Sequence, residues 1–174
     1  RSLASATRIV EVLDEKIDIT DENSQDISVK QGEIEFDHVW FKYKAEAKEY
    51  VLSDVSFHIK PGQTVGIIGQ TGSAKTTLVQ LIPRLYDATK GTVRIDGVDV
   101  KNYPVKHLRD AIAVVLQKNT LFSGSLISNL RWGNENATKE EIDEACHIAC
   151  VDEFLDRLPA GYESEMGQGG VNVS

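Results

Sequence analysis

The sequence predicts an α/β fold, from strand patterns in its first two thirds and helical patterns in its last third. Residues 34–39 and 51–59 alternate apolar and polar side chains, as the half-buried strands of an antiparallel sheet do. Residues 64–68 and 112–116 are short, continuous apolar segments of the kind that a parallel sheet buries on both faces. We therefore expect a core that combines an antiparallel β subdomain with buried parallel strands.

The chain divides into three parts along its length. Residues 1–31 combine a helix with a polar linker, residues 32–118 form the sheet-containing core, and residues 119–174 form a helical subdomain. The N-terminal helix is amphipathic, because its apolar residues recur every three or four positions. These residues are Leu3, Ala6, Ile9, Val10 and Leu13.

A further strand and several helices complete the predicted elements. The strand covers residues 91–95 and is followed by Asp96-Gly97, a dipeptide typical of tight turns. Thr138 is a good helix N-cap, because Glu141 follows three residues later. Helical spacing is found over residues 126–130, 139–150 and 151–158.

The net charge of −8 is spread unevenly along the chain. Residues 33–133 carry a net charge of +3, which suits an anionic ligand, whereas residues 134–174 carry −8. We interpret the acidic end as a solvated helix face, and it argues against a nucleic-acid surface. No apolar segment approaches the length of about 18 residues that spans a membrane, and residues 1–16 do not resemble a signal peptide. Because position 1 is not Met, we do not expect it to be the natural start.

Two cysteines, Cys146 and Cys150, lie four positions apart in a helical stretch. With His147 they raise the possibility of a metal site. The spacing matches no common zinc pattern, and His147 would point away from the face that the cysteines share. We interpret the cysteines as a buried, reduced pair.

A glycine-rich loop, Gly69-Gln70-Thr71-Gly72-Ser73-Ala74-Lys75-Thr76, joins the apolar segment 64–68 to a helix expected over residues 76–85. This order of elements suits a triphosphate. Glycines let successive backbone N–H groups point inward, and the following helix adds the partial positive charge of its N-terminus. Lys75 would reach the outer phosphates, and the Thr76 hydroxyl would ligate Mg²⁺. The residues expected to contact the nucleotide here are Gly69, Thr71, Gly72, Ser73, Ala74, Lys75, Thr76 and Thr77.

One position departs from the strict phosphate-loop pattern, which has glycine where this chain has Ala74. Either position 74 has a negative φ, which suits alanine, or the loop is strained by roughly 1 kcal/mol or more. We favour the first alternative. The N–H donor, Lys75 and the Thr76 hydroxyl all remain, and a disabled loop would more readily have lost its lysine.

With these motifs, the sequence resembles the nucleotide-binding domain of ATP-binding cassette (ABC) transporters, of the exporter type, from about Gly32 onward. The resemblance implies a P-loop NTPase core with an antiparallel β subdomain and a helical subdomain, incomplete at the C-terminus. Phe41-Lys42-Tyr43 is similar to the aromatic loop that precedes the phosphate loop in this family. This implies that Tyr43 stacks on adenine, a contact worth roughly 1–3 kcal/mol.

Three later motifs extend the resemblance. Residues 115–126 resemble the Gln loop of exporters, which implies that Gln117 touches Mg²⁺ or the attacking water and links the site to the membrane domain. Residues 161–170 resemble the segment that faces the coupling helices, with Gln168 where the family commonly has Glu. Ser174 stands where the signature motif begins, which implies a contact with the γ-phosphate held by a partner subunit.

The resemblance also implies what surrounds this domain. Residues 1–31 are similar to the connector helix and linker that follow the last membrane helix, so we expect a transmembrane domain upstream. The resemblance then places this chain at the cytoplasmic face of the cell membrane. A second nucleotide-binding domain would pair head to tail with this one, as a homodimer or heterodimer. We expect the chain to stop inside the signature motif, at Ser174. The family's Asp that holds Mg²⁺ through water, and its glutamate that activates the attacking water, would then lie beyond the chain.

The resemblance implies an ATPase domain of an exporter, with ATP and Mg²⁺ as ligands and with Lys75 and Gln117 as catalytic residues. A further resemblance around residues 129–133 implies that the exporter is of the multidrug type. We expect the 174 residues alone to show no sustained turnover. Two alternatives remain open. One is a nucleotide-gated module that binds ATP without efficient turnover, and the other is a soluble ATPase of the same family. Upstream hydrophobic segments would exclude the second.

Overall fold

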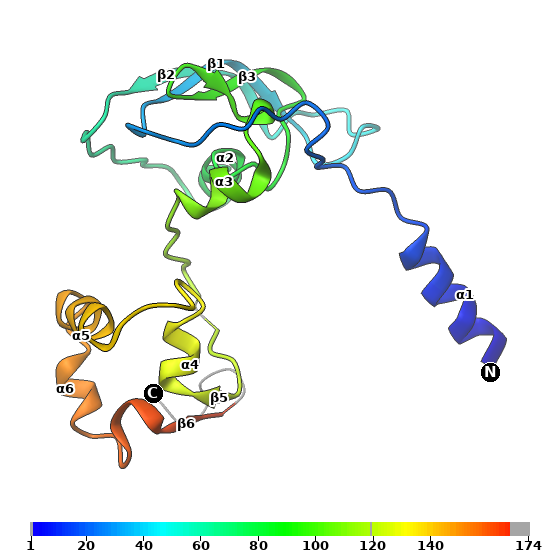
Figure 1. The fold of residues 1–174 in the computed structure, drawn as a ribbon. Helices are drawn as coiled ribbons and strands as arrows, with labels where there is room; N and C mark the ends of the chain where they lie inside the picture. The colour runs from blue at the N-terminus through cyan, green and yellow to red at the C-terminus, as the bar shows by residue number, and fades with distance from the viewer. Residues whose placement is uncertain (1, 119, 168–174) are drawn as a thin grey trace. The chain divides into compact units, whose positions relative to one another are not determined.

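The computed structural model describes residues 2–118 and 120–167 and contains two compact units, Arg1–Val114 and Val115–Ser174 (Figure 1). The first unit is built on a four-stranded antiparallel sheet with the strand order β2-β1-β3-β4. The strands are β1 (Ile34–Phe41), β2 (Leu52–Ile59), β3 (Lys90–Ile95) and β4 (Val98–Asp99). The predicted α/β class and its antiparallel β subdomain are therefore confirmed.

The core of the first unit forms on β1, which pairs with β2 on one side and with β3 on the other. Phe36, Val39 and Phe41 on this strand are all buried. Three helical segments add further buried side chains to the same core, and the two α-helices lie on one side of the sheet in Figure 1. These segments are α2 (Lys75–Leu81), the 3-10 helix η1 (Val100–Asn102) and α3 (Val105–Asp110).

The segment from residue 15 to residue 32, predicted as a polar linker, is hydrogen-bonded to the first unit at several points, and we call it the strap. The Thr20 carbonyl oxygen accepts a hydrogen bond from the Arg84 guanidinium at 3.0 Å. The Asp21 carboxylate accepts one from the backbone N–H of Val105 at 2.8 Å. Two apolar residues of the strap pack against the core, Ile27 and Val29.

The C-terminal end of the strap is bound by the turn between β3 and β4. Asp96 and Gly97 both have positive φ, at 51° and 77°, as the predicted tight turn requires. The Asp96 carboxylate accepts hydrogen bonds from the backbone N–H groups of Lys30, Gln31 and Glu33, at 2.6, 3.0 and 3.0 Å. Partial burial acts to raise the pKa of Asp96, but these N–H groups outweigh it and hold the pKa below its ordinary value.

Two predicted strands are wrong. Residues 64–68 and 112–116 are irregular and mostly exposed, with Ile68 at 99% and Val115 at 91% exposure. A strand of a parallel sheet needs a neighbouring strand to supply its hydrogen-bond partners, and no strand within residues 2–118 and 120–167 pairs with either segment. The apolar composition of the two segments favours burial, but most of their side chains are exposed in the structure.

The helix after the glycine-rich loop is shorter than predicted, because α2 ends at Leu81 rather than at Leu85. Pro83 has no N–H to donate to a carbonyl of the preceding turn, so the helical hydrogen-bond pattern cannot continue through it. Arg84 then has a φ of 51°, outside the right-handed helical region. The last predicted helix is also shorter, since α6 covers only Asp152–Leu155.

The second unit is mainly helical, as predicted. Its elements are β5 (Gly124–Ser125), α4 (Leu126–Leu130), α5 (Lys139–Ile148), α6, the 3-10 helix η2 (Gly161–Glu163) and β6 (Glu165–Met166), with β5 and β6 paired. The predicted cap of α5 is present. The Thr138 hydroxyl accepts the Glu141 N–H at 3.2 Å, and the Glu141 carboxylate accepts the Thr138 N–H at 2.8 Å. The remaining helix is α1 (Ser2–Leu13). No helix among the described residues has the length and apolar character needed to cross a membrane.

The prediction of a buried cysteine pair is half wrong. Both cysteines are free, but only Cys146 is buried, and Cys150 is exposed. Cys150 lies beyond the end of α5 and has a φ of 57°, so it leaves the helical path before the face it would share with Cys146 is completed.

The favoured prediction for position 74 is also wrong. Ala74 is the N-cap of α2, with φ 61° and ψ 17°, which is the left-handed conformation rather than one with negative φ. This conformation costs a residue with a Cβ roughly 1–2 kcal/mol of conformational energy, whereas glycine adopts it without that cost. The chain therefore has the strained alternative, with alanine in a backbone conformation suited to glycine.

We predict that Asp96→Asn destabilises the protein by about 2 kcal/mol at pH 7, because an amide accepts the N–H groups of Lys30, Gln31 and Glu33 less strongly than a carboxylate. The pKa of Asp96 is lowered on folding, so its stabilisation is present above the unfolded-state pKa and is lost as pH falls through the lower folded-state value. Urea unfolding at a series of pH values should show the difference from wild type shrinking in acid. Asp110→Asn, at an exposed carboxylate, is the matched control and should change little. A pH-independent loss for Asp96→Asn would contradict the prediction.

We predict that Ala74→Gly stabilises the protein by about 0.5–1 kcal/mol, because glycine relieves the left-handed strain by more than it adds to unfolded-state entropy. Ala111→Gly is the control. Ala111 has a right-handed conformation, with φ −88° and ψ −3°, so glycine there should destabilise instead. Urea unfolding measures both changes, and equal losses at the two positions would be incompatible with a left-handed Ala74.

Candidate nucleotide-binding site

The glycine-rich loop closes around the ammonium group of Lys75. The Lys75 Nζ donates hydrogen bonds to the carbonyl oxygens of Gly69 and Gln70, at 2.8 and 2.7 Å, and to the Ser73 hydroxyl at 3.2 Å. The backbone N–H of Ser73 also donates to the Gln70 carbonyl at 3.1 Å. The structure thus brings the predicted lysine and the loop backbone together in one tight turn.

The turn is tight at position 69, where glycine leaves room for the Ser73 side chain. A Cβ placed on Gly69 would lie 2.5 Å from the Ser73 hydroxyl oxygen, a distance at which one of the two groups would have to move. Gly72 has a φ of 83°, which also favours glycine. The loop residues Gly69, Thr71, Gly72, Ser73 and Thr76 are exposed, so an incoming phosphate can reach them.

The last residue of the loop, Thr76, is suited to binding a magnesium ion. Thr76 directly follows Lys75 at the start of α2, and its side chain is exposed. A hydroxyl is a hard oxygen ligand of the kind that Mg²⁺ accepts, and Mg²⁺ in nucleotide sites takes most of its other ligands from phosphates and water. One such hydroxyl beside the lysine is therefore a suitable protein ligand.

Tyr43 is fixed beside α2 by three contacts. Its hydroxyl shares a hydrogen bond with the Thr77 hydroxyl at 2.8 Å. Its ring meets the rings of Phe41 and Tyr86 edge-on, with centroids 4.9 and 5.2 Å away and interplanar angles of 82° and 87°. The residue is still 51% exposed, whereas Thr77 is only 6% exposed. The structure therefore places the predicted adenine-stacking residue next to the helix that follows the phosphate loop.

A pocket of about 450 Å³ lies against Tyr43 on the side of the strap. Aromatic rings and two isoleucines provide its apolar lining, and two carboxylates with one lysine provide its polar lining. Neither Tyr86 nor the strap at this position belongs to a periodic pattern, so the sequence predicts no role for them. The lining residues are Ile17, Asp18, Ile19, Phe41, Lys42, Tyr43, Leu85, Tyr86 and Asp87.

The remaining predicted site residues lie elsewhere in the chain. Gln117 belongs to the second unit, where it is exposed in the irregular segment before β5. Gln168 and Ser174 lie outside the described residues. The roles assigned to these three residues stay predictions.

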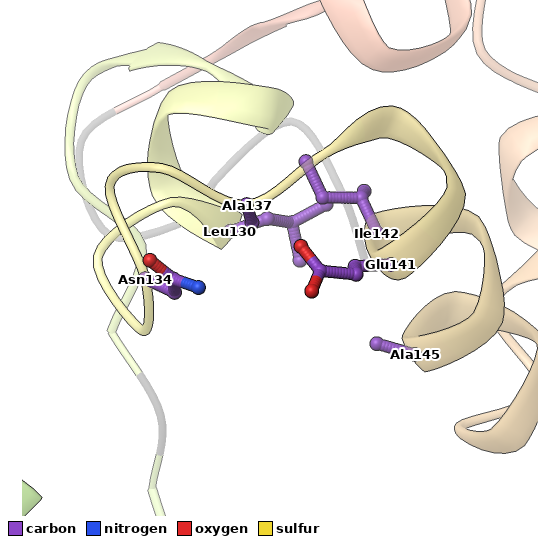
Figure 2. A pocket seen from close by; sticks show the side chains of 6 residues that line it. All are labelled: Leu130, Asn134, Ala137, Glu141, Ile142 and Ala145. Atoms are coloured by element: carbon purple, nitrogen blue, oxygen red, sulfur yellow. The ribbon is translucent and has the colours of Figure 1, made fainter.

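The second unit has an open pocket of about 340 Å³ of its own, between the end of α4 and the first turns of α5 (Figure 2). Its lining consists mainly of apolar side chains, with the Asn134 amide and the Glu141 carboxylate as polar groups (Figure 2). The carboxylate is bound to the Thr138 N–H in the helix cap and would repel a phosphate. This pocket is therefore unsuited to the phosphates of a nucleotide. The remaining lining residues are Leu130, Ala137, Ile142 and Ala145.

Comparison with known proteins identifies relatives of the whole chain. It is 45% identical over 175 residues to the uncharacterized ABC transporter ATP-binding protein YfiB of Bacillus subtilis, covering 100% of this chain and 30% of that protein. It is 40% identical over 167 residues to a putative multidrug export ATP-binding/permease protein of Staphylococcus aureus, covering 95% of this chain and 29% of that protein. The chain thus spans a little under a third of the length of these relatives.

A solved structure and a family profile agree with these relatives. The structure of a bacterial Atm1-family ABC exporter with ATP bound matches 99% of this chain and 30% of its own, with a TM-score of 0.89 and 31% sequence identity. The profile described as ABC transporter matches residues 52–170, which include the glycine-rich loop, α2 and all of the described second unit. On these grounds, the chain belongs to the ABC transporter family.

Proposed function

We propose that this chain is the ATP-binding part of an exporter, in which ATP binding and hydrolysis drive the export of a substrate, of the multidrug type, across a membrane. The observation that carries the proposal is the closed, exposed loop around Lys75, with Tyr43 beside α2. The names of the relatives support the exporter assignment, since one is a putative multidrug export protein and another is an Atm1-family exporter.

Lys75 performs the first task in this function. In the structure its ammonium group is bound to two carbonyl oxygens and a hydroxyl of the loop, so its charge already lies against the loop backbone. A triphosphate that enters the loop offers anionic oxygens to this ammonium, so attraction between opposite charges adds to the hydrogen bonds. Lys75 then holds the outer phosphates in place, and positioning of this kind is a large part of phosphoryl-transfer catalysis.

Tyr43 and Thr76 perform the other two tasks. The half-exposed ring of Tyr43 stacks on the adenine base, which anchors the end of the nucleotide opposite to the γ-phosphate. The Thr76 hydroxyl holds Mg²⁺, and this ion neutralises charge on the β- and γ-phosphates when it is bound. Gln117 contacts Mg²⁺ or the attacking water in this proposal.

The site works in a dimer and with a membrane domain. A second nucleotide-binding domain, identical or different, contributes its signature motif to the ATP held here, and Ser174 of this chain does the same for the partner's ATP. The domain acts at the cytoplasmic face of the cell membrane, attached through residues 1–31 to a transmembrane domain. The length of the relatives, of which this chain covers 29–30%, leaves room for such a domain.

A second candidate function is a nucleotide-gated module that binds ATP without efficient turnover. The observation that favours it is Ala74, whose left-handed conformation strains the loop where the family pattern has glycine. ATP binding by the full-length gene product, with no release of phosphate over many equivalents of ATP, would select this candidate. Sustained phosphate release would select the ATPase.

We predict that Lys75→Ala in the full-length gene product weakens ATP binding by at least roughly 100-fold, because it removes the charge that faces the outer phosphates. Equilibrium titration with MgATP measures the change. Lys106→Ala is the matched control, since Lys106 is an exposed lysine on α3 that pairs only with Asp110 among the ion pairs of the described residues, and it should bind ATP like wild type. Unchanged affinity in Lys75→Ala would rule out the assigned site.

A further inference from the structure

The hydrogen bond between Tyr43 and Thr77 joins two parts of the candidate site that are far apart in sequence. Tyr43 follows β1, whereas Thr77 is the third residue of α2, 34 positions later. Thr77 is 6% exposed, so its side chain faces the interior rather than the solvent that reaches Thr76. The residue that follows the predicted magnesium ligand is thus bound to the predicted adenine-stacking residue.

This contact fixes the direction of the Tyr43 ring. The nearly perpendicular rings of Phe41 and Tyr86 limit rotation of the Tyr43 ring, and the hydrogen bond to Thr77 holds its hydroxyl end. The ring would have to break this bond to swing away from α2. A binding group that is ordered before its ligand arrives loses less conformational entropy on binding, so the ligand is bound more tightly.

We propose that Thr77 is a positioning residue, which holds the Tyr43 ring in the orientation that stacks on the nucleotide base. The inference rests on the proposed function, because it concerns recognition of the same nucleotide. It assigns Thr77 a role different from the direct nucleotide contact expected from the sequence. Through this residue, α2 serves both ends of the nucleotide, with Lys75 and Thr76 at the phosphates and Thr77 behind the base.

The alternative is that the Thr77 hydroxyl binds a phosphate directly. Either hydroxyl can donate the hydrogen bond between Tyr43 and Thr77, so Thr77 would be free to donate to a phosphate only if Tyr43 is the donor. The two roles predict that removal of the hydroxyl weakens the binding of different ligands. A positioning residue affects only ligands that carry a base, whereas a phosphate contact affects inorganic tripolyphosphate as well.

The test measures equilibrium affinities of the full-length gene product for MgATP and for magnesium tripolyphosphate. Thr77→Val removes the hydroxyl and keeps the branched shape, and Tyr43→Phe keeps the ring and removes its hydroxyl. Each should weaken MgATP binding about five-fold, as expected for the loss of one hydrogen bond, and leave tripolyphosphate affinity unchanged. The double variant should bind MgATP no more weakly than either single variant, because both remove the same contact.

Two further variants complete the series. Thr77→Ser restores a hydroxyl and should bind MgATP like wild type, which separates the hydrogen bond from any general loss of packing. Tyr43→Ala removes the ring itself and should weaken MgATP binding more than Tyr43→Phe does. Thermal unfolding of each variant without nucleotide shows whether it is folded. If Thr77→Val does not fold, Tyr43→Phe and Thr77→Ser still test the inference.

Several results would overturn the inference while leaving the proposed function intact. These are equal weakening of MgATP and tripolyphosphate binding by Thr77→Val, wild-type MgATP affinity in Tyr43→Phe, or additive effects in the double variant. A wild-type protein that binds neither ligand would instead refute the proposed function, and the inference with it.

Discussion

The pairing of β1 on both of its edges is the interaction on which the rest of the first unit depends. β2 and β3 come from distant parts of the chain and meet only through β1. The buried side chains of β1 belong to the same core as Leu81 of α2, so the strand and the helix pack into one cluster. Since Tyr43 lies two residues beyond the end of β1 and Thr77 lies on α2, the distance between them follows from this packing.

The alternating strands, the glycine-rich loop, the Asp96-Gly97 turn and the Thr138 cap could all be predicted from the sequence. Each depends on neighbouring residues, so a short segment contains the whole signal. The segments 64–68 and 112–116 could not be predicted in the same way. Their composition records a preference for burial, but strand formation depends on a partner that a local pattern does not reveal.

Within the candidate site, the loop and Lys75 follow from the motif, whereas the surroundings of Tyr43 do not. Tyr86 lies 43 positions along the chain from Tyr43, and only the folded structure brings the two rings together. The strap is a similar case, because a carboxylate at position 96 binds backbone groups at positions 30–33. Polar composition predicts a solvated linker for this segment, and long-range hydrogen bonds to its backbone leave no trace in that composition.

The exposed apolar segments have a practical consequence for work with these residues. Val65, Ile67 and Ile68 in the first unit, and Val114, Val115 and Leu116 at the junction of the units, are all between 44% and 99% exposed. Extended, uncharged apolar segments of this kind adhere to one another and to chaperones in a concentration-dependent way. The 174 residues alone are therefore expected to self-associate increasingly as their concentration rises.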